Sequence, residues 1–199
     1  MNTTGLLAAG VAASLSMATV PHAAAHERSL DEIKKEVMRR AGHINPFEGI
    51  RREDAAQVVA SLTSLDPDQW AQLWCRIGLA YEANADARAG QHADAGELAA
   101  LYTLAFEYCR VARYPVPSTV DKQEAYRHSL RIFRKAAKHF DPTLQIVEIP
   151  FEGKKLIGYL QIPTGGTKPP LVMHWGGWTG GRRIASAPAA PFIGRHLPL

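Results

Sequence analysis

The chain has 199 residues, of which 46% are hydrophobic and 21% charged, a composition typical of a globular protein with one large domain or two small ones. Its net charge of +4 reflects the segment from Gly153 onward, which contains six Lys or Arg residues and no acidic residue. These six are scattered among Pro, Gly and Ala instead of forming a stripe with aromatic residues, so we do not expect nucleic-acid binding.

The first segment, residues 1–27, is an apolar leader. Residues 6–20 (LLAAGVAASLSMATV) carry no charge and precede Ala23-Ala24-Ala25, a pattern that resembles the apolar region and cleavage site of a signal peptide. The run is too short for a membrane span, and no Lys or Arg precedes it. Two interpretations stay open: a signal peptide within residues 1–25 that exports the protein to the periplasm, or a disordered leader on a cytoplasmic protein.

Residues 28–142 are predicted to form a helical, cap-like domain of five helices. Ser29 and Glu32 form a capping box before a helix that ends near Arg40, and Asp66-Pro67-Asp68 begins a longer helix that ends at Gly90. Helices are also expected over 52–61, 94–113 and 121–139. In the second we expect Ala56, Val59 and Ala60 to face the core, and in the third an apolar face formed by Trp70, Leu73, Trp74, Ile77 and Tyr81.

The two cysteines of the chain fall on the third and fourth predicted helices. Cys75 and Cys109 have no Cys or His neighbours at metal-ligand spacing, so no metal site is expected. We interpret them as two buried thiols. A disulfide between the two helices is expected only if the protein is exported.

After Pro142 the pattern changes to strands. Residues 145–151 and 156–162 alternate as a β-hairpin around a turn at 152–155, and residues 171–175 form an apolar run that predicts a buried strand. That run ends at Gly176-Gly177. Glycines after a strand let backbone N–H groups point into a cleft, where they can stabilise the oxyanion of acyl transfer.

In order and spacing, several short motifs resemble the α/β-hydrolases related to the fermentation–respiration switch protein and to 2,6-dihydropseudooxynicotine hydrolase. The motifs span residues 30–177 and comprise 114–119 (YPVPST), 124–127 (EAYR), 147–153 (VEIPFEG), 158–160 (GYL), 170–172 (PLV) and Gly176-Gly177.

The resemblance implies an α+β chain: a helical domain, followed at 143–177 by the first strands of an incomplete α/β-hydrolase sheet. It also implies a small-molecule substrate and a Ser–Asp–His mechanism that uses neither a metal nor an organic cofactor. The oxyanion loop would be Gly176, Gly177 and Trp178, with backbone N–H donors around Gly177 and Trp178.

The catalytic triad itself is not recognisable in these 199 residues. No G-x-S-x-G motif occurs, Ser186 lacks a preceding strand and flanking glycines, and His174 precedes the Gly-Gly pair, where it is expected to shape the loop. His92, His128 and His139 are expected on the surface of helices, and Asp141 in a turn before Pro142.

The end of the chain departs from the resemblance. Residues 178–199 show no helix or strand pattern, and we interpret them as an aberrant, disordered tail that follows a reading-frame shift near Gly177. We therefore predict an inactive N-terminal fragment of a hydrolase of ester or carbon–carbon bonds. The alternative is a helical protein-interaction module without catalytic activity.

Overall fold

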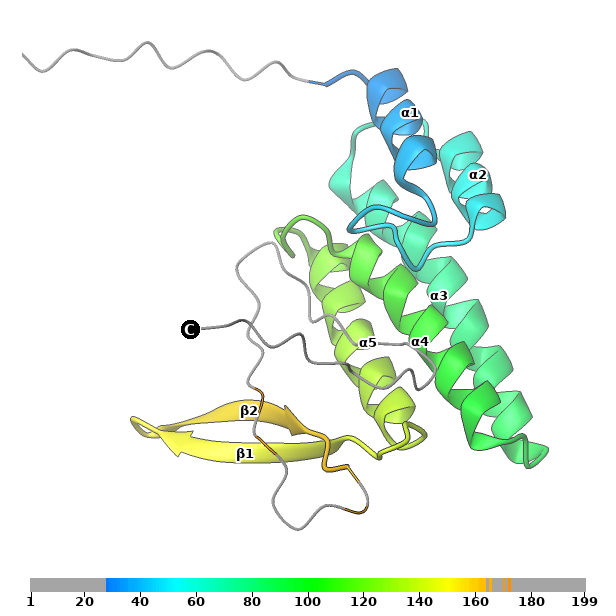
Figure 1. The fold of residues 1–199 in the computed structure, drawn as a ribbon. Coiled ribbons are helices and arrows are strands. Elements are labelled where there is room, and N and C mark those ends of the chain that lie inside the picture. Colours follow the sequence, from blue (N-terminus) through cyan, green and yellow to red (C-terminus); the bar gives the residue numbers. More distant parts are fainter. Residues whose placement is uncertain (1–27, 164, 166–169, 171, 173–199) are drawn as a thin grey trace, which may run out of the picture.

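The structure is a computed structural model, and it describes residues 28–163, 165, 170 and 172. Five helices come first in the chain, followed by one antiparallel β-hairpin (Figure 1). The elements are α1 (Leu30–Arg40), α2 (Arg52–Ser61), α3 (Pro67–Gly90), α4 (Ala95–Ala112), α5 (Val120–Ala137), β1 (Gln145–Phe151) and β2 (Lys154–Leu160). The α+β class predicted from the sequence is confirmed.

Local capping explains where the helices begin. The Ser29 hydroxyl accepts from the Glu32 N–H at 3.3 Å, and the Glu32 carboxylate accepts from the Ser29 N–H at 2.7 Å, which completes the predicted capping box. Asp66 and Asp94 cap α3 and α4 by accepting backbone N–H groups at 3.0 Å. These contacts satisfy donors that have no partner within the helix.

Helices α3, α4 and α5 pack side by side as a three-helix bundle, and α1 and α2 lie against one end of it (Figure 1). Small residues form the contact between α3 and α4, where Gly78 lies against Ala105 and Cys109, and Cys75 meets Cys109. Small side chains let two helices approach closely.

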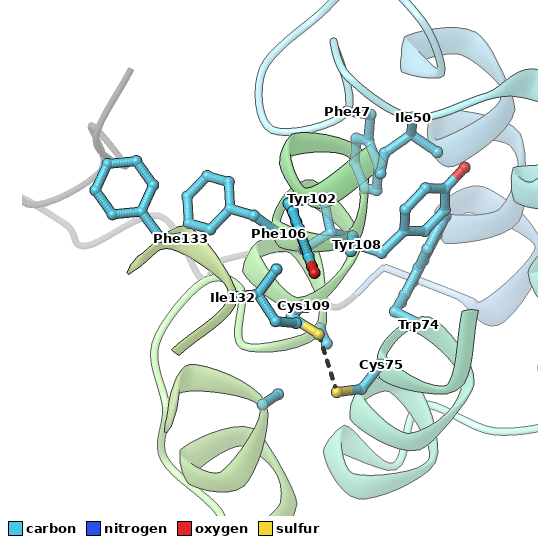
Figure 2. Packing of buried hydrophobic residues seen from close by; sticks show 14 of the residues in the cluster. Phe47, Ile50, Trp74, Cys75, Tyr102, Phe106, Tyr108, Cys109, Ile132 and Phe133 are labelled. Atoms are coloured by element: carbon cyan, nitrogen blue, oxygen red, sulfur yellow. Dashed lines mark hydrogen bonds between the residues drawn. The ribbon is translucent and has the colours of Figure 1, made fainter. Parts of the chain in front are cut away.

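Aromatic rings join the bundle to the segment between α1 and α2. Phe47 packs on Trp74 at 5.7 Å between ring centroids, Trp74 packs on Tyr108 at 6.2 Å, and Tyr108 stacks on Tyr81 at 5.4 Å. Figure 2 shows Phe47, Trp74 and Tyr108 in this core. The Trp70 indole N–H donates to the carbonyl of Val111 at 3.0 Å. The predicted aromatic face of α3 therefore belongs to the core.

Two of the expected core positions are wrong. In α2 the buried residues are Ala55 and Val58, whereas Ala56 and Ala60 are exposed. Helix α2 has only weak amphipathic character, so the sequence leaves the rotation of its apolar face poorly determined. The contact with α3 and α4 determines which side of α2 is buried, because the Asp54 side chain, next to Ala55, accepts hydrogen bonds from the hydroxyls of Tyr81 and Tyr108.

The hairpin is present, but its turn is shorter than the predicted 152–155. Glu152 and Gly153 alone form the turn, with φ of 46° and 71°, and β2 begins at Lys154 and ends at Leu160. A two-residue turn of type I′ needs positive φ at both positions, which explains the glycine. Lys154 and Lys155 therefore belong to the ladder.

Three of the predicted segments fall outside the residues that the structure describes. This holds for the leader 1–27, for the tail 178–199 and, apart from Val172, for the strand predicted at 171–175. Among the described residues, no helix is long and apolar enough to cross a membrane.

Candidate functional site

The predicted oxyanion loop of Gly176, Gly177 and Trp178 lies outside the described residues, as do His174 and Ser186. The structure does describe the element that leads into this part of the chain, the hairpin, and the helical surface from which the hairpin extends. We therefore build the candidate site from the junction between α5 and the hairpin.

Aromatic contacts attach the hairpin to the helices. The Tyr159 ring of β2 packs edge-on against Phe133 of α5, with 4.9 Å between ring centroids, and Phe133 also contacts Phe106 of α4 at 5.4 Å. Two hydrogen bonds close the same end: Leu144 N–H to the Ala137 carbonyl at 3.2 Å, and the Gln161 amide to the Pro142 carbonyl at 2.8 Å. The chain thus enters and leaves the hairpin beside the end of α5.

Both faces of the hairpin carry apolar side chains that are partly exposed among the described residues. One face holds Ile149, Phe151 and Leu156, which are 51–53% exposed, and the other holds Ile146 and Ile157, at 42% and 39%. A strand pair with one solvent face would alternate apolar and polar residues. Apolar residues on both faces are typical of sheets covered on both sides, as in α/β proteins.

A charged network connects α3 and α5 above this junction. The Glu82 carboxylate of α3 is 6% exposed, is ion-paired with the Arg131 guanidinium and accepts from Lys135 Nζ at 2.9 Å. Lys135 Nζ also donates to both oxygens of Asp86 at 2.7 Å. Burial alone would raise the pKa of Asp86, but the hydrogen bonds from Lys135 and Tyr102 outweigh it and lower this pKa. The Asp86 carboxylate is therefore held as an anion by fixed partners.

Replacing Arg131 by alanine should lower the free energy of unfolding by about 2 kcal/mol, because Glu82 then remains buried with Lys135 as its one described cation. Arg127→Ala is the matched control. Arg127 pairs with Glu124 on the same helix, but both side chains are at least half exposed, so about 0.5 kcal/mol or less is expected. Urea unfolding of both variants measures the difference, and equal losses would show that burial of Glu82 adds nothing.

Tyr102 of α4 lies at the edge of this network. Its hydroxyl donates to Asp86 Oδ1 at 2.6 Å, and His139 stacks on its ring at 5.7 Å with 11° between the planes. Burial, followed by the hydrogen bond to Asp86, raises the pKa of Tyr102 from 10.0 to about 12. The phenol therefore stays protonated well beyond its usual range.

This raised pKa predicts a loss of stability in alkali. The contribution of Tyr102 is fully present below pH 10, its unfolded pKa, and is lost as the pH rises through about 12, its folded pKa. The thermal midpoint of the wild-type protein should therefore fall more steeply than that of Tyr102→Phe as the pH rises from 10 to about 12. Parallel pH profiles for the two proteins would contradict the prediction.

A second polar cluster ties α2 to the bundle at its other end. Asp54 Oδ2 accepts from the hydroxyls of both Tyr81, at 2.7 Å, and Tyr108, and the Tyr108 oxygen accepts the Arg51 N–H at 3.0 Å. The Arg51 guanidinium lies 5.3 Å from the centre of the Tyr81 ring. Burial and the bond to Asp54 raise the pKa of both tyrosines. Their hydroxyls serve as fixed donors that hold the helices together.

The motif at 114–119, between α4 and α5, is held by a buried lysine. Lys122 is 6% exposed, and its Nζ donates to the Tyr114 carbonyl at 2.9 Å, across the connection between the two helices. Burial lowers the pKa of Lys122. The lysine thus satisfies a carbonyl in the connection between α4 and α5.

The described histidines and serines do not form a nucleophile–base pair. His128 Nδ1 lies 2.7 Å from Arg131 Nη2, His43 contacts the Ala41 carbonyl, and His92 lies exposed in a turn. The Ser129 hydroxyl donates to the Tyr126 carbonyl at 2.7 Å inside α5. His92 is on the surface as predicted, whereas His128 and His139 are half-buried. His139 stacks on the Tyr102 ring of α4, and His128 contacts Arg131 within α5. Within the described chain, no cluster of His, Cys, Asp and Glu is arranged to hold a metal ion.

A helical unit followed by strands with apolar side chains on both faces is the order expected for the start of an α/β-hydrolase with an N-terminal helical segment. Comparison with known proteins agrees: the family model for FrsA-like esterases matches residues 53–180. The chain belongs to the FrsA-like esterase family.

Two curated relatives are also α/β-hydrolases. The chain is 28% identical over 152 residues to the alpha/beta hydrolase ucsC of an Acremonium species, a match that covers 66% of this chain and 30% of that protein. It is 27% identical over 143 residues to the alpha/beta hydrolase psoB of Aspergillus fumigatus, covering 66% and 32%. The chain thus spans about a third of the length of these relatives.

Proposed function

We propose that this chain forms the helical cap and first strands of a serine hydrolase that cleaves ester or carbon–carbon bonds in a small molecule, and that these 199 residues do not catalyse the reaction by themselves. The observation that carries the proposal is the hairpin. Its two apolar faces need covering layers on both sides, as the sheet of an α/β-hydrolase has. Membership of the FrsA-like esterase family supports ester hydrolysis. The resemblance to 2,6-dihydropseudooxynicotine hydrolase supports carbon–carbon cleavage as the alternative.

Within this function the helical unit is the rigid part that shapes the substrate pocket. Helix α5 holds the open end of the hairpin through Phe133 and Tyr159, so the position of the strands follows that of the bundle. Ion pairs such as that of Glu82 with Arg131 and Lys135 fix α5 against α3. A pocket wall built on helices holds its geometry better than one built on loops.

The Gly176-Gly177 corner is proposed to supply the oxyanion donors. Backbone N–H groups at Gly177 and Trp178 would stabilise the negative oxygen that forms when a serine attacks the substrate carbonyl. A backbone donor does not depend on the side chain of its own residue. The catalytic Ser, Asp and His are proposed to be encoded beyond Gly177 in another reading frame.

The first experiment uses the chain as it is. The purified 199-residue protein should show no saturable hydrolysis of p-nitrophenyl acetate or butyrate above the buffer rate, because a base without a positioned nucleophile does not accelerate the reaction. Saturable turnover that is abolished by replacing one of its own serines would overturn the proposal.

The second experiment reads the gene. The DNA downstream of the Gly177 codon should encode, in another frame, G-x-S-x-G followed by an Asp and a His. The absence of such sequence, together with stoichiometric binding of a protein by the helices, would favour the interaction module instead.

If that longer polypeptide is active, Gly177→Pro tests the oxyanion donors. Proline removes the N–H of residue 177, and the loss of one such donor lowers kcat by about a hundredfold to a thousandfold. Gly177→Ala is the control, since it keeps the N–H. Equal kcat values for the two variants would exclude residue 177 as a donor.

A further inference from the structure

Two buried thiols face each other between α3 and α4. The sulfur atoms of Cys75 and Cys109 are 3.3 Å apart, within hydrogen-bond distance, and both cysteines are free (Figure 2). They are the only cysteines of the chain. A disulfide bond is about 2.05 Å long, so the two sulfurs need to move together by only about 1.3 Å to bond.

The helices that carry the two cysteines are unusually close at this point. Gly78 lies one turn after Cys75, and a Cβ atom placed on it would be 2.9 Å from both Cys109 Sγ and the Ala105 carbonyl oxygen. The backbones therefore approach so closely that no side chain fits between them. A disulfide needs Cα atoms about 4.4–6.8 Å apart, and such proximity of two helices requires small residues at their contact.

The two thiols differ in access and acidity. Cys75 is 9% exposed, whereas Cys109 is 0% exposed, so a small oxidant reaches Cys75 first. The hydrogen bond between the two sulfurs lowers the pKa of the Cys75 thiol, while the same bond and burial raise the pKa of Cys109. Exposure and acidity therefore favour Cys75 as the thiol that an oxidant attacks first. Cys109 is then the thiol that can attack the oxidised sulfur of Cys75.

We propose that Cys75 and Cys109 form a site of reversible covalent modification, at which a water-sized peroxide closes an intramolecular disulfide between α3 and α4. The Cys75 thiolate attacks hydrogen peroxide, whose O–O bond breaks to leave a sulfenic acid on Cys75 and hydroxide. The Cys109 sulfur then attacks the sulfenic sulfur, the S–O bond breaks, and water leaves with the thiol proton. Two thiols and one peroxide thus give one disulfide and two waters.

The cross-link joins residues that are 34 positions apart in sequence and clamps the contact between α3 and α4. A disulfide that closes a loop of this length lowers the conformational entropy of the unfolded chain, so it should raise the thermal midpoint by about 10 °C. The oxidised protein is thus expected to be the more stable form, as for disulfides of exported proteins.

The test treats the folded full chain with a slight excess of hydrogen peroxide, blocks remaining thiols with iodoacetamide in denaturant, and digests with trypsin. The peptides 53–76 and 89–110 contain the two cysteines and no methionine, so sulfur oxidation in them reports on cysteine alone. The expected product is one species that links both peptides, weighs two hydrogens less than their sum, and separates again on reduction.

Three results would overturn the proposal: both peptides alkylated after treatment, sulfinic acid on Cys75 without a cross-link, or a disulfide between two chains. The variants Cys75→Ala and Cys109→Ala are the controls, and neither should gain thermal stability on oxidation. If one variant fails to fold, the wild-type midpoint before and after reduction still decides the matter, since an unchanged midpoint contradicts a bond that clamps α3 to α4.

Discussion

Replacing Gly78 by alanine should destabilise the helical unit of α1–α5 by about 2–3 kcal/mol, a large effect for a single added methyl group. The new Cβ would lie 2.9 Å from the Ala105 carbonyl oxygen and 3.0 Å from Tyr108 Cβ. Two of its nearest atoms thus belong to α4 close to the main chain and cannot turn away as the end of a long side chain can. Helices α3 and α4 must separate, and the contacts of Trp74 with Tyr108 loosen with them.

Gly90→Ala is the matched control for this prediction. Gly90 is the last residue of the same helix, and a Cβ there meets nothing within 4 Å. Alanine favours the helix over glycine, so the free energy of unfolding should stay the same or rise by about 0.5 kcal/mol. Urea denaturation followed by circular dichroism compares both variants with the wild type. A Gly78→Ala protein as stable as Gly90→Ala would mean that the close approach of α3 and α4 is not needed.

Replacing Asp54 by alanine should lower the free energy of unfolding by about 3 kcal/mol, because one carboxylate accepts from two tyrosine hydroxyls. Tyr108 is 0% exposed, so water cannot easily replace the lost acceptor. The change also removes the polar tie between α2 and the bundle. Loss of α2 packing should appear as increased hydrogen exchange at the buried amides of α2.

Two further variants test how much of this loss comes from the hydrogen-bond acceptor at Asp54. Asp54→Asn keeps one oxygen acceptor and should lose roughly half as much stability as Asp54→Ala. Glu53→Ala, at the exposed neighbouring position, should change the free energy of unfolding by about 0.5 kcal/mol or less. The cluster explanation fails if the loss caused by Asp54→Ala is matched by Glu53→Ala.

These effects bear on function because the helical unit is proposed to be the fixed wall of a substrate pocket. The helices that would shape the pocket are tied together by contacts that tolerate little change: the α3–α4 approach at Gly78, the Asp54 cluster and the Glu82 network. The hairpin depends on this unit through Phe133 and Tyr159. Loosening the bundle should therefore disturb the position of the strands that follow.

The limits of the five helices were readable from the sequence. Capping residues such as Ser29, Asp66 and Asp94, and the proline-rich break at 114–119, act within one turn of the chain. The presence of the hairpin was also readable, because a segment with a glycine at 152–155 separates two runs of β-forming residues. Its exact turn was not, since two residues with positive φ are visible only in the backbone.

The sequence by itself determined which segments are helices or strands, because caps, breakers and apolar periodicity act locally. It also carried the short motifs that led to the hydrolase class. Only the tertiary structure decided which side of α2 is buried, which carboxylates are ion-paired, and that Cys75 and Cys109 meet at 3.3 Å. These features join residues tens of positions apart, and their distances depend on how closely the helices pack.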